Sequence, residues 1–274
     1  MPVRLVAADL DGTLVRRDRT VSARTRAALQ ECRRRDIVVV VVTARRWHAA
    51  APVVRGLELS GLAVAVGGGA VRDIASGRVV SGRLLPGGVV ATAAAAVDAA
   101  GLQPMVAVEH GELHLAGDPR RDGPAAATYL ARGRRLRVSR PVLLAPRPAT
   151  RVLAMGGASR IAAAARACAG LRARITVQDC IVPRDPHGER AMELHVAAAD
   201  KGSALRDLCV ALHLTPGAVL AIGDAPSDVP MFAVAGTAVL MGQAEPGLRR
   251  HGAVLAPDVD ADGAAWAIEQ LVLA

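Results

Sequence analysis

Residues 3–13 read Val-Arg-Leu-Val-Ala-Ala-Asp-Leu-Asp-Gly-Thr, in which an apolar-rich run, Val3 to Ala8, is followed by the two acidic residues Asp9 and Asp11. Short runs rich in Val, Leu and Ala, bounded by turn residues, are typical of a strand in a covered parallel sheet. Ligands bind at the carboxyl ends of such strands. Residues two apart in an extended chain point to the same side, so Asp9 and Asp11 can face one ligand before Gly12 permits a sharp turn. A hard divalent cation or a shared proton would relieve the repulsion between the two carboxylates, and the stretch therefore predicts a functional site.

The chain after this stretch alternates between expected helices and strands. Three βα units in succession predict a parallel, doubly wound sheet. The expected elements are a helix from Ser22 to about Arg35, a strand over 37–42, a helix from about Trp47 and a strand over 62–66 that ends in glycines 67–69.

The pattern changes near Arg83 and returns after Lys201, so one domain interrupted by another is the simplest account. Residues 132–148, with clusters of Arg and Pro, are interpreted as a loop. His110 and His114 are expected to be exposed hairpin residues. The inserted part predicts helices over 86–100 and 161–171, two short strands within 105–115 that turn at Gly111, and strands over 152–155, 175–178 and 191–196. The final part predicts a helix to about Leu212, strands over 219–222, 238–241 and 254–255, and a closing helix over 264–273.

Composition excludes several classes of protein. The chain has 274 residues, a formal net charge of +9 and few aromatic residues, so it lacks platforms for stacking nucleic-acid bases. The N-terminus has no signal-peptide pattern, and no apolar run reaches membrane-spanning length. Four scattered cysteines fit neither a zinc site nor a redox pair. We therefore expect a soluble cytoplasmic protein with reduced thiols that binds neither nucleic acid nor membrane.

Lys201 is the single lysine among 34 basic residues, in a chain that contains no asparagine. A lysine that persists in such a composition is expected where arginine cannot serve, because lysine offers a compact point charge and arginine a wide planar fork. The alternative is a surviving lysine without a role, at a helix start capped by Asp200.

Four groups of residues resemble the motifs of the haloacid dehalogenase superfamily, in the order and spacing of its phosphatases. They are Asp9-Leu10-Asp11-Gly12-Thr13-Leu14, Thr43, Lys201, and Gly223-Asp224 with Asp228. The long insert and the run Met192-Glu193-Leu194-His195 before Asp200 are similar to the Cof-like branch, which has a large α/β cap. The resemblance implies an α/β fold: a doubly wound, Rossmann-like parallel-sheet core over 1–82 and 196–274, with an inserted α/β cap domain over 83–195.

A carboxylate can attack phosphorus to form an acyl phosphate, and Asp9 is the candidate nucleophile. The resemblance implies that Asp11 acts as general acid and base, and that Lys201 pairs with the phosphate and with Asp9. It also implies a Mg²⁺ site made by Asp9, the backbone carbonyl of Asp11, and Asp224. Asp228 would ligate the metal through water or orient Lys201.

The remaining candidate residues would bind phosphate or substrate: Thr43, Arg45, Gly68, Gly69 and Ser227. The chain departs from the family at two of these places. Ser227 and Gly68 stand where asparagine is usual, which removes two amide side chains, although serine and glycine N–H groups can still donate hydrogen bonds.

The main hypothesis is a Mg²⁺-dependent phosphatase acting on a small phosphorylated metabolite, such as a sugar phosphate, through an aspartyl-phosphate intermediate. The expected protein is a monomer or homodimer. The expected cap holds 16 Arg against 9 acidic residues, which suits an anionic substrate or merely a solvated surface. The alternatives are a sugar phosphomutase and a phosphometabolite-binding regulator with a weakened active site.

Overall fold

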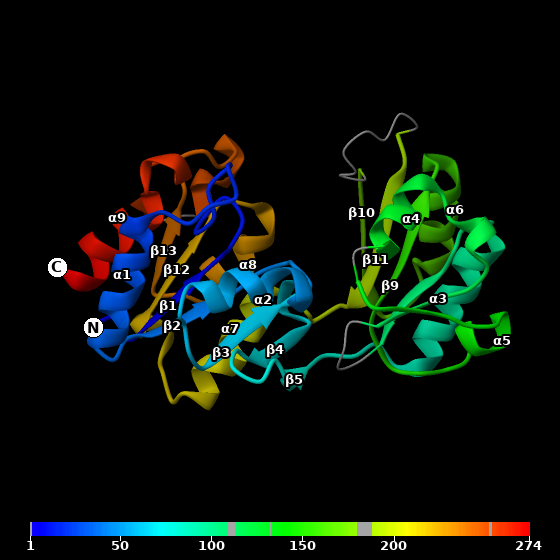
Figure 1. The fold of residues 1–274 in the computed structure, drawn as a ribbon, viewed down its shortest axis with the longest axis horizontal. Helices are drawn as coiled ribbons and strands as arrows, with labels where there is room; N and C mark the ends of the chain where they lie inside the picture. Colours follow the sequence, from blue (N-terminus) through cyan, green and yellow to red (C-terminus); the bar gives the residue numbers. More distant parts are fainter. Residues whose placement is uncertain (1, 109–112, 132, 180–187, 252–253) are drawn as a thin grey trace. The chain divides into compact units, whose positions relative to one another are not determined.

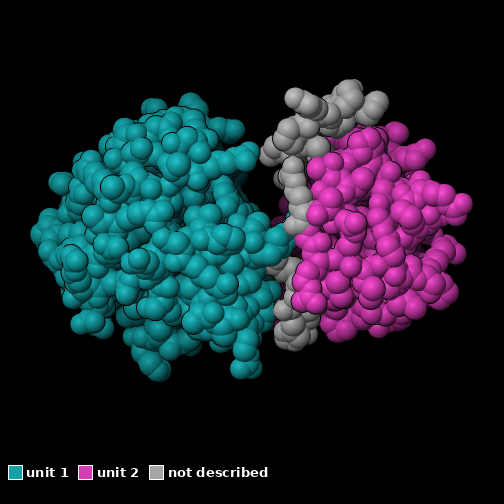
Figure 2. All heavy atoms as spheres, in the orientation of Figure 1, with its two compact units in different colours: residues 1–81, 199–274 teal, residues 82–198 magenta. Residues whose placement is uncertain are grey.

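The computed structural model describes residues 2–108, 113–131, 133–179, 188–251 and 254–274. The expected turn at Gly111, together with His110 and Cys180, lies outside these residues. The chain folds into two compact units, one formed by Met1–Ser81 with Ala199–Ala274 and the other by Gly82–Ala198 (Figure 2). The first unit is therefore built from both ends of the chain, and the second is an insertion into it.

Unit 1 contains a parallel sheet with the strand order β14-β13-β12-β1-β2 (Figure 1). The register places Ala8 beside both Ile222 and Val41, so three strands end at the same edge of the sheet. The strands are β1 (Leu5–Ala8), β2 (Val38–Val41), β12 (Val219–Gly223), β13 (Thr237–Leu240) and β14 (Val254–Leu255). The helices are α1 (Ala23–Arg34), α2 (Trp47–Gly56), α7 (Lys201–Ala211), α8 (Val229–Phe232) and α9 (Gly263–Ile268).

Helices cover both faces of this sheet. Val6 and Ala8 pack in an apolar cluster with residues of α1, α2 and α9, whereas Leu5 and Ala7 pack with residues of α7 and α8. All of β1 is buried as a result, which explains its uninterrupted apolar run. The predicted α/β, doubly wound, parallel-sheet core is confirmed.

The expected third βα unit is wrong. Strand β3 (Leu62–Ala65) is followed not by an α-helix but by β4 (Ala70–Asp73), which pairs with it antiparallel, and then by β5 (Val79–Gly82), in a sheet of the order β3-β4-β5. A parallel bridge between Val42 and Val64 links β3 to the end of β2. The reversal uses left-handed backbone at Gly67 and Gly68, with φ of +61° and +100°, which glycine adopts without steric cost.

Unit 2 is a mixed sheet with the order β10-β11-β9-β6-β7-β8, antiparallel except between β7 and β8. Residues of α3 and α6 pack on one face of the sheet, and α4 packs on the other. The strands are β6 (Met105–Val108), β7 (His114–Ala116), β8 (Arg135–Arg137), β9 (Ala149–Gly156), β10 (Ala173–Asp179) and β11 (Arg190–Val196). The helices are α3 (Gly87–Ala99), α4 (Pro124–Ala131), α5 (Arg140–Leu143) and α6 (Ala158–Cys168).

Two expectations for this unit are wrong. The expected loop over 132–148 contains β8 and α5, because pairing with β7 holds β8 extended and Pro141 suits the first turn of a helix. His114 is 1 % exposed instead of lying on a surface hairpin, and its Nε2 lies 2.9 Å from the hydroxyl of Tyr129. Helix α4, which carries Tyr129, was not expected from the sequence.

Within the described ranges, no helix combines the length and the hydropathy that a membrane span requires.

Candidate active site

The sheet of unit 1 gathers three polar residues at one edge. Asp9 follows β1, Thr43 lies just beyond β2, and Asp224 follows β12. Neighbouring parallel strands end together, and the backbone N–H of Asp9 donates to the carbonyl of Ile222 at 2.9 Å. Asp9 and Thr43 are buried, with 6 % and 2 % exposure. The order of the strands therefore brings together residues that lie up to 215 positions apart in the sequence.

Lys201 lies at the first position of α7, and its side chain is 1 % exposed. Its Nζ is 2.8 Å from Asp9 Oδ1 and 2.5 Å from Asp228 Oδ1. The helix begins here because the Asp200 side chain accepts a hydrogen bond from the backbone N–H of Ser203, while the Ser203 hydroxyl accepts from the Asp200 N–H. Asp200 therefore caps the helix, as the sequence suggested, and the lysine also bridges two buried carboxylates.

Asp228 is fully buried in the turn that follows β12. While Oδ1 accepts from Lys201, Oδ2 accepts from the backbone N–H groups of Asp224 at 3.0 Å and Ala225 at 2.9 Å. One carboxylate thus fixes both the ammonium group and the loop that carries Asp224. Of the two roles considered for Asp228, the contacts favour orienting Lys201.

The site holds more negative than positive charge. Burial raises the pKa of Asp9 to about 7, and the nearby charge of Asp228 adds to the rise while Lys201 opposes it. Burial, again with Asp228, raises the pKa of Asp224 to about 6. Burial alone would lower the pKa of Lys201, but the charges of Asp9 and Asp228 raise it above its ordinary value. The Lys201 ammonium group therefore stays charged, but its single positive charge does not balance the negative charge of the carboxylates.

The donor set fits a hard divalent cation. Asp9, Asp224 and Asp228 each offer a carboxylate oxygen, and these atoms lie within 4.8 Å of one another. Oδ1 of Asp224 is buried, and within the described part of the chain it has no hydrogen-bond partner. A buried oxygen that accepts no hydrogen bond is costly, and a bound cation would satisfy its lone pairs. Oxygen ligands and excess negative charge are what Mg²⁺ requires.

Asp11 and Arg45 lie beside this cluster and bind each other. The Nε of Arg45 donates to Asp11 Oδ2 at 2.7 Å, and a second guanidinium nitrogen donates to Oδ1. The backbone N–H of Arg45 also donates to the Thr43 hydroxyl oxygen at 3.0 Å. The Asp11 side chain is 57 % exposed, in contrast to the buried carboxylates. The structure therefore pairs the expected acid–base carboxylate with an expected substrate-binding arginine.

The remaining candidates lie around the site in less direct ways. A Cβ at Gly68 would lie 2.1 Å from the backbone oxygen of Asp200, so this glycine lets the loop pack against the start of α7. The Gly69 N–H donates to the carbonyl of Val66 at 3.1 Å, which engages a donor expected to be free for phosphate. Ser227 is exposed in the short turn Pro226–Asp228.

Sequence reasoning missed Gln243, which follows β13. Its side-chain amide donates to the carbonyl of Gly12 at 2.5 Å and reaches Asp224 Oδ2 at 3.5 Å, while its Oε1 accepts from the Val259 N–H at 3.0 Å. The rule that ligands bind at the carboxyl ends of parallel strands would have indicated this position, had the place of β13 beside β12 been known.

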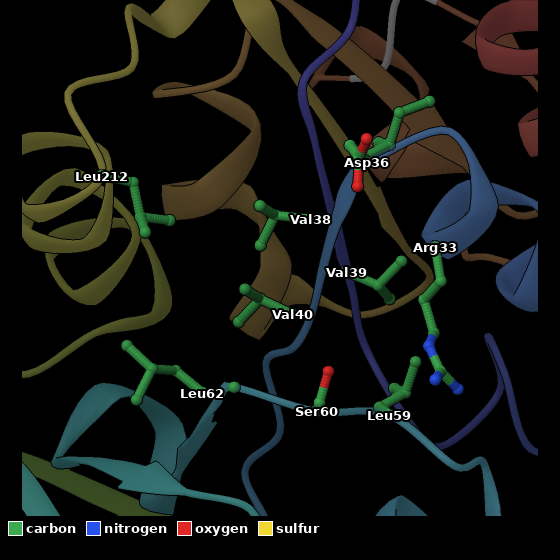
Figure 3. Close-up of a pocket in the computed structure, with 11 residues that line it drawn as sticks. Arg33, Asp36, Val38, Val39, Val40, Leu59, Ser60, Leu62 and Leu212 are labelled. Atoms are coloured by element: carbon green, nitrogen blue, oxygen red, sulfur yellow. The ribbon is translucent and has the colours of Figure 1, made fainter.

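A cavity of about 390 Å³ in unit 1 lies away from these residues. It opens where β2 and β3 diverge at their amino ends, between Val38 and Leu62, and Leu212 also contributes to its wall (Figure 3). Its lining is mostly aliphatic. Since the acidic cluster lies at the carboxyl ends of the strands, this cavity is not the candidate active site.

We expect Gly12→Ala to weaken divalent-cation binding at least about tenfold, because the new Cβ would lie 2.1 Å from Asp224 Oδ2. Gly61→Ala is the matched control. Both glycines have a left-handed φ, +71° and +86°, but a Cβ at Gly61 meets nothing within 4 Å. Calorimetric titration with Mn²⁺ should separate the two variants, whereas urea unfolding should show a backbone cost of about 1 kcal/mol in both. Equal Mn²⁺ affinities would contradict this account.

The raised pKa values predict that the metal-free protein loses stability as the pH rises. Asp9 has a higher pKa in the folded protein, about 7, than its ordinary value of 3.8, so the folded state binds more protons between these pH values. Stability must then fall as the pH rises through that window. Melting temperatures measured in chelator should decrease from about pH 5 to about pH 8. Added Mg²⁺ should raise the melting temperature more at the higher pH, where the carboxylates are ionised. An equally steep decrease in Asp9→Asn would contradict the assignment to Asp9.

The described residues thus form a doubly wound parallel sheet whose carboxyl edge carries a cluster of carboxylates and the buried ammonium group of Lys201, and this edge is the candidate active site of an α/β protein. Over residues 6–268 the chain matches the family model of the haloacid dehalogenase-like hydrolases, and it belongs to that family. The resemblance drawn from the sequence motifs is thereby confirmed.

Solved structures share the fold over nearly the whole chain. A haloacid dehalogenase-like hydrolase from Bacteroides thetaiotaomicron is 23 % identical, with a TM-score of 0.79 over 98 % of this chain and 99 % of its own. A protein from Thermotoga maritima is 18 % identical, with a TM-score of 0.80 over 98 % of this chain and 97 % of its own.

Curated relatives match over shorter segments. Phosphoserine phosphatase of Halobacterium salinarum is 38 % identical over 100 residues, which are 36 % of this chain and 47 % of the relative. The 5-amino-6-(5-phospho-D-ribitylamino)uracil phosphatase of Bacillus subtilis is 33 % identical over 85 residues, which are 31 % of this chain and 30 % of the relative. The chain thus spans less than half the length of each.

Proposed function

We propose that the protein is a Mg²⁺-dependent phosphatase that hydrolyses a small phosphorylated metabolite, such as a sugar phosphate, through an aspartyl phosphate on Asp9. The observation that carries the proposal is the contact of Lys201 with Asp9 and Asp228, beside the Asp224 carboxylate. The two curated relatives described above are named as phosphatases, of phosphoserine and of a phosphoribityl compound, which supports a phosphomonoester as substrate.

The first half-reaction transfers the phosphoryl group to Asp9. A carboxylate oxygen of Asp9 forms a bond to phosphorus as the bond to the substrate oxygen breaks, and protonated Asp11 gives its proton to the departing alkoxide. The Lys201 ammonium group neutralises charge on the phosphate, and the Thr43 hydroxyl donates a hydrogen bond to a phosphate oxygen. When bound, the metal would supply charge neutralisation at the phosphoryl oxygens, with Asp9 and Asp224 as its carboxylate ligands.

The second half-reaction releases phosphate. Ionised Asp11 takes a proton from water, the water oxygen bonds to phosphorus, and the acyl phosphate bond to Asp9 breaks. In this mechanism Asp11 therefore cycles between two protonation states. Arg45 donates to both carboxylate oxygens of Asp11, and a phosphate group would compete for the same guanidinium.

We further propose that residues 1–82 and 196–274 form the catalytic core and that 83–195 form a cap that selects the substrate. The excess of arginine over acidic residues in the insert supports an anionic substrate. Some of this charge is already paired, because Asp98 accepts from both Arg121 and Arg140, and Asp122 pairs with Arg137. Three buried free cysteines, Cys32, Cys168 and Cys209, are consistent with work in the reducing cytoplasm.

The test is phosphate release from a panel of sugar phosphates, phosphoserine and phosphoribityl compounds, with Mg²⁺ and with chelator, alongside Asp9→Asn. We expect Mg²⁺-dependent turnover of at least one compound that Asp9→Asn lacks. Isomerised product without free phosphate would instead identify a phosphomutase. Tight binding without any turnover would favour the regulator hypothesis, and turnover unchanged in Asp9→Asn would overturn the mechanism.

A further inference from the structure

Gln243 joins three segments that meet at the acidic cluster. Its amide nitrogen lies 2.5 Å from the carbonyl oxygen of Gly12 and 3.5 Å from Asp224 Oδ2, and its oxygen accepts from Val259 at 3.0 Å. These contacts engage both ends of the side-chain amide. The side chain is therefore held in one orientation, with its nitrogen toward the acidic cluster.

The contacts of Gln243 fix the orientation of the Asp224 side chain as well as that of the Gln243 side chain. Its NH₂ group is on the side of Oδ2, whereas Oδ1 is the buried oxygen that has no hydrogen-bond partner in the described residues. Because a hydrogen-bond donor lies beside Oδ2 and, among the described residues, none lies beside Oδ1, the Asp224 carboxylate favours one rotamer. In that rotamer Oδ1 is left to bind a cation. The same NH₂ group holds the turn at Gly12, directly after the Asp9–Asp11 stretch.

A second set of contacts fastens the same segments independently. Arg17, in the loop after β1, donates to Asp258 at 2.8 Å and also pairs with Asp260, on either side of Val259. These ion pairs are more exposed than the Gln243 contacts, and they do not touch Asp224. Two sets of contacts, those of Gln243 and those of Arg17, therefore hold the turn at Val259. Of the two, the contacts of Gln243 reach the Asp224 carboxylate of the candidate metal site, so Arg17 provides a matched control.

We propose that Gln243 is a positioning residue for the metal ligand Asp224, setting the affinity of the site for a divalent cation. This inference rests on the proposed function, because that function requires the cation. Partners that orient a metal ligand are typically worth 10- to 100-fold in metal affinity. A glutamate at this position could not donate to either oxygen and would place a further negative charge beside Asp224.

The experiment titrates the full-length protein, freed of metal, with Mn²⁺ and measures Kd by calorimetry, with urea unfolding in parallel. Gln243→Leu keeps most of the side-chain volume without the amide, and Arg17→Ala removes the other set of contacts. We expect Gln243→Leu to raise Kd at least about tenfold, and Arg17→Ala to leave it within about twofold.

Asp224→Asn separates failure of this inference from failure of the proposed function. If Asp224→Asn binds Mn²⁺ as tightly as the natural protein, the metal site itself is wrong, and the inference falls with it. If Asp224→Asn loses binding but Gln243→Leu does not, the metal site stands and the role given to Gln243 is overturned. Equal losses of affinity in Gln243→Leu and Arg17→Ala would show a general clamp of the turn, which also overturns the specific role.

Discussion

We expect Asp9→Asn to lower kcat for phosphate release by about 10⁴-fold or more, because an amide cannot form the acyl phosphate. The same change should leave the melting temperature equal or higher near neutral pH, since it removes a buried carboxylate whose ionisation is opposed by burial. Steady-state kinetics on the best substrate of the panel, with thermal unfolding in parallel, measures both effects.

Asp36→Asn is the matched control for this experiment. Asp36 is exposed and has a left-handed φ of +56°, which asparagine also tolerates, so kcat and the melting temperature should not change. Loss of activity together with loss of folded structure in Asp9→Asn would contradict the expected separation of function from stability. Residual turnover close to that of the natural protein would remove Asp9 from the role of nucleophile.

Lys201→Met should both inactivate and destabilise the protein. The ammonium lies between Asp9 and Asp228, whose side chains are 8 % and 0 % exposed, and removing one partner of a buried ion pair typically costs 3–5 kcal/mol. We expect a loss of about that size in the free energy of unfolding, measured in urea at a pH where the carboxylates are ionised. Lys201→Arg should also be poorly tolerated, because a wide guanidinium must enter a site where lysine is already 1 % exposed.

A second substitution makes the electrostatic cause testable. Asp228→Asn in the Lys201→Met background removes one uncompensated charge, while the amide oxygen can still accept from the N–H groups of Asp224 and Ala225. The double variant should therefore be more stable than Lys201→Met. Arg34→Met removes a surface ion pair with Glu31 and should cost less than about 1 kcal/mol. A double variant less stable than Lys201→Met would show that packing, not charge, accounts for the loss.

The sequence was sufficient to predict the edge of the sheet that carries the candidate site. Asp9, Thr43 and Asp224 each follow a buried apolar run, and the carboxyl ends of neighbouring parallel strands must meet at one edge. Lys201 was indicated by composition, because it is the single lysine in a chain rich in arginine. These signals are local in the sequence, and the topology of a doubly wound sheet converts them into proximity.

Other features of the site depend on contacts that no local pattern encodes. The burial of Asp228 results from a turn that directs its carboxylate back to two N–H groups and to Lys201. The contacts of Gln243 depend on β13 lying beside β12, a pairing that sequence alone did not provide. The mutual ion pair of Asp11 and Arg45 likewise joins two residues that the sequence assigned to separate tasks.

The errors in the fold have a similar origin. The glycines after β3 were interpreted as the end of a βα unit, but left-handed backbone at Gly67 and Gly68 turns the chain into a hairpin. Helix α4 lies in an Ala-rich segment in which apolar and polar residues do not recur with a clear helical period. Its apolar face was therefore not evident before its packing on the sheet was known. His114 is buried for the same reason, because Tyr129 of α4 covers it.

The most direct test of the account is to identify the covalent intermediate. The protein is mixed with Mg²⁺ and a turned-over substrate, quenched in acid during the first turnovers, digested and analysed by mass spectrometry. We predict one phosphoryl group on the peptide that contains Asp9, removable by hydroxylamine and absent from Asp9→Asn. A phosphoryl group on any other residue, or phosphate release with no labelled peptide under conditions that trap an acyl phosphate, would contradict the account.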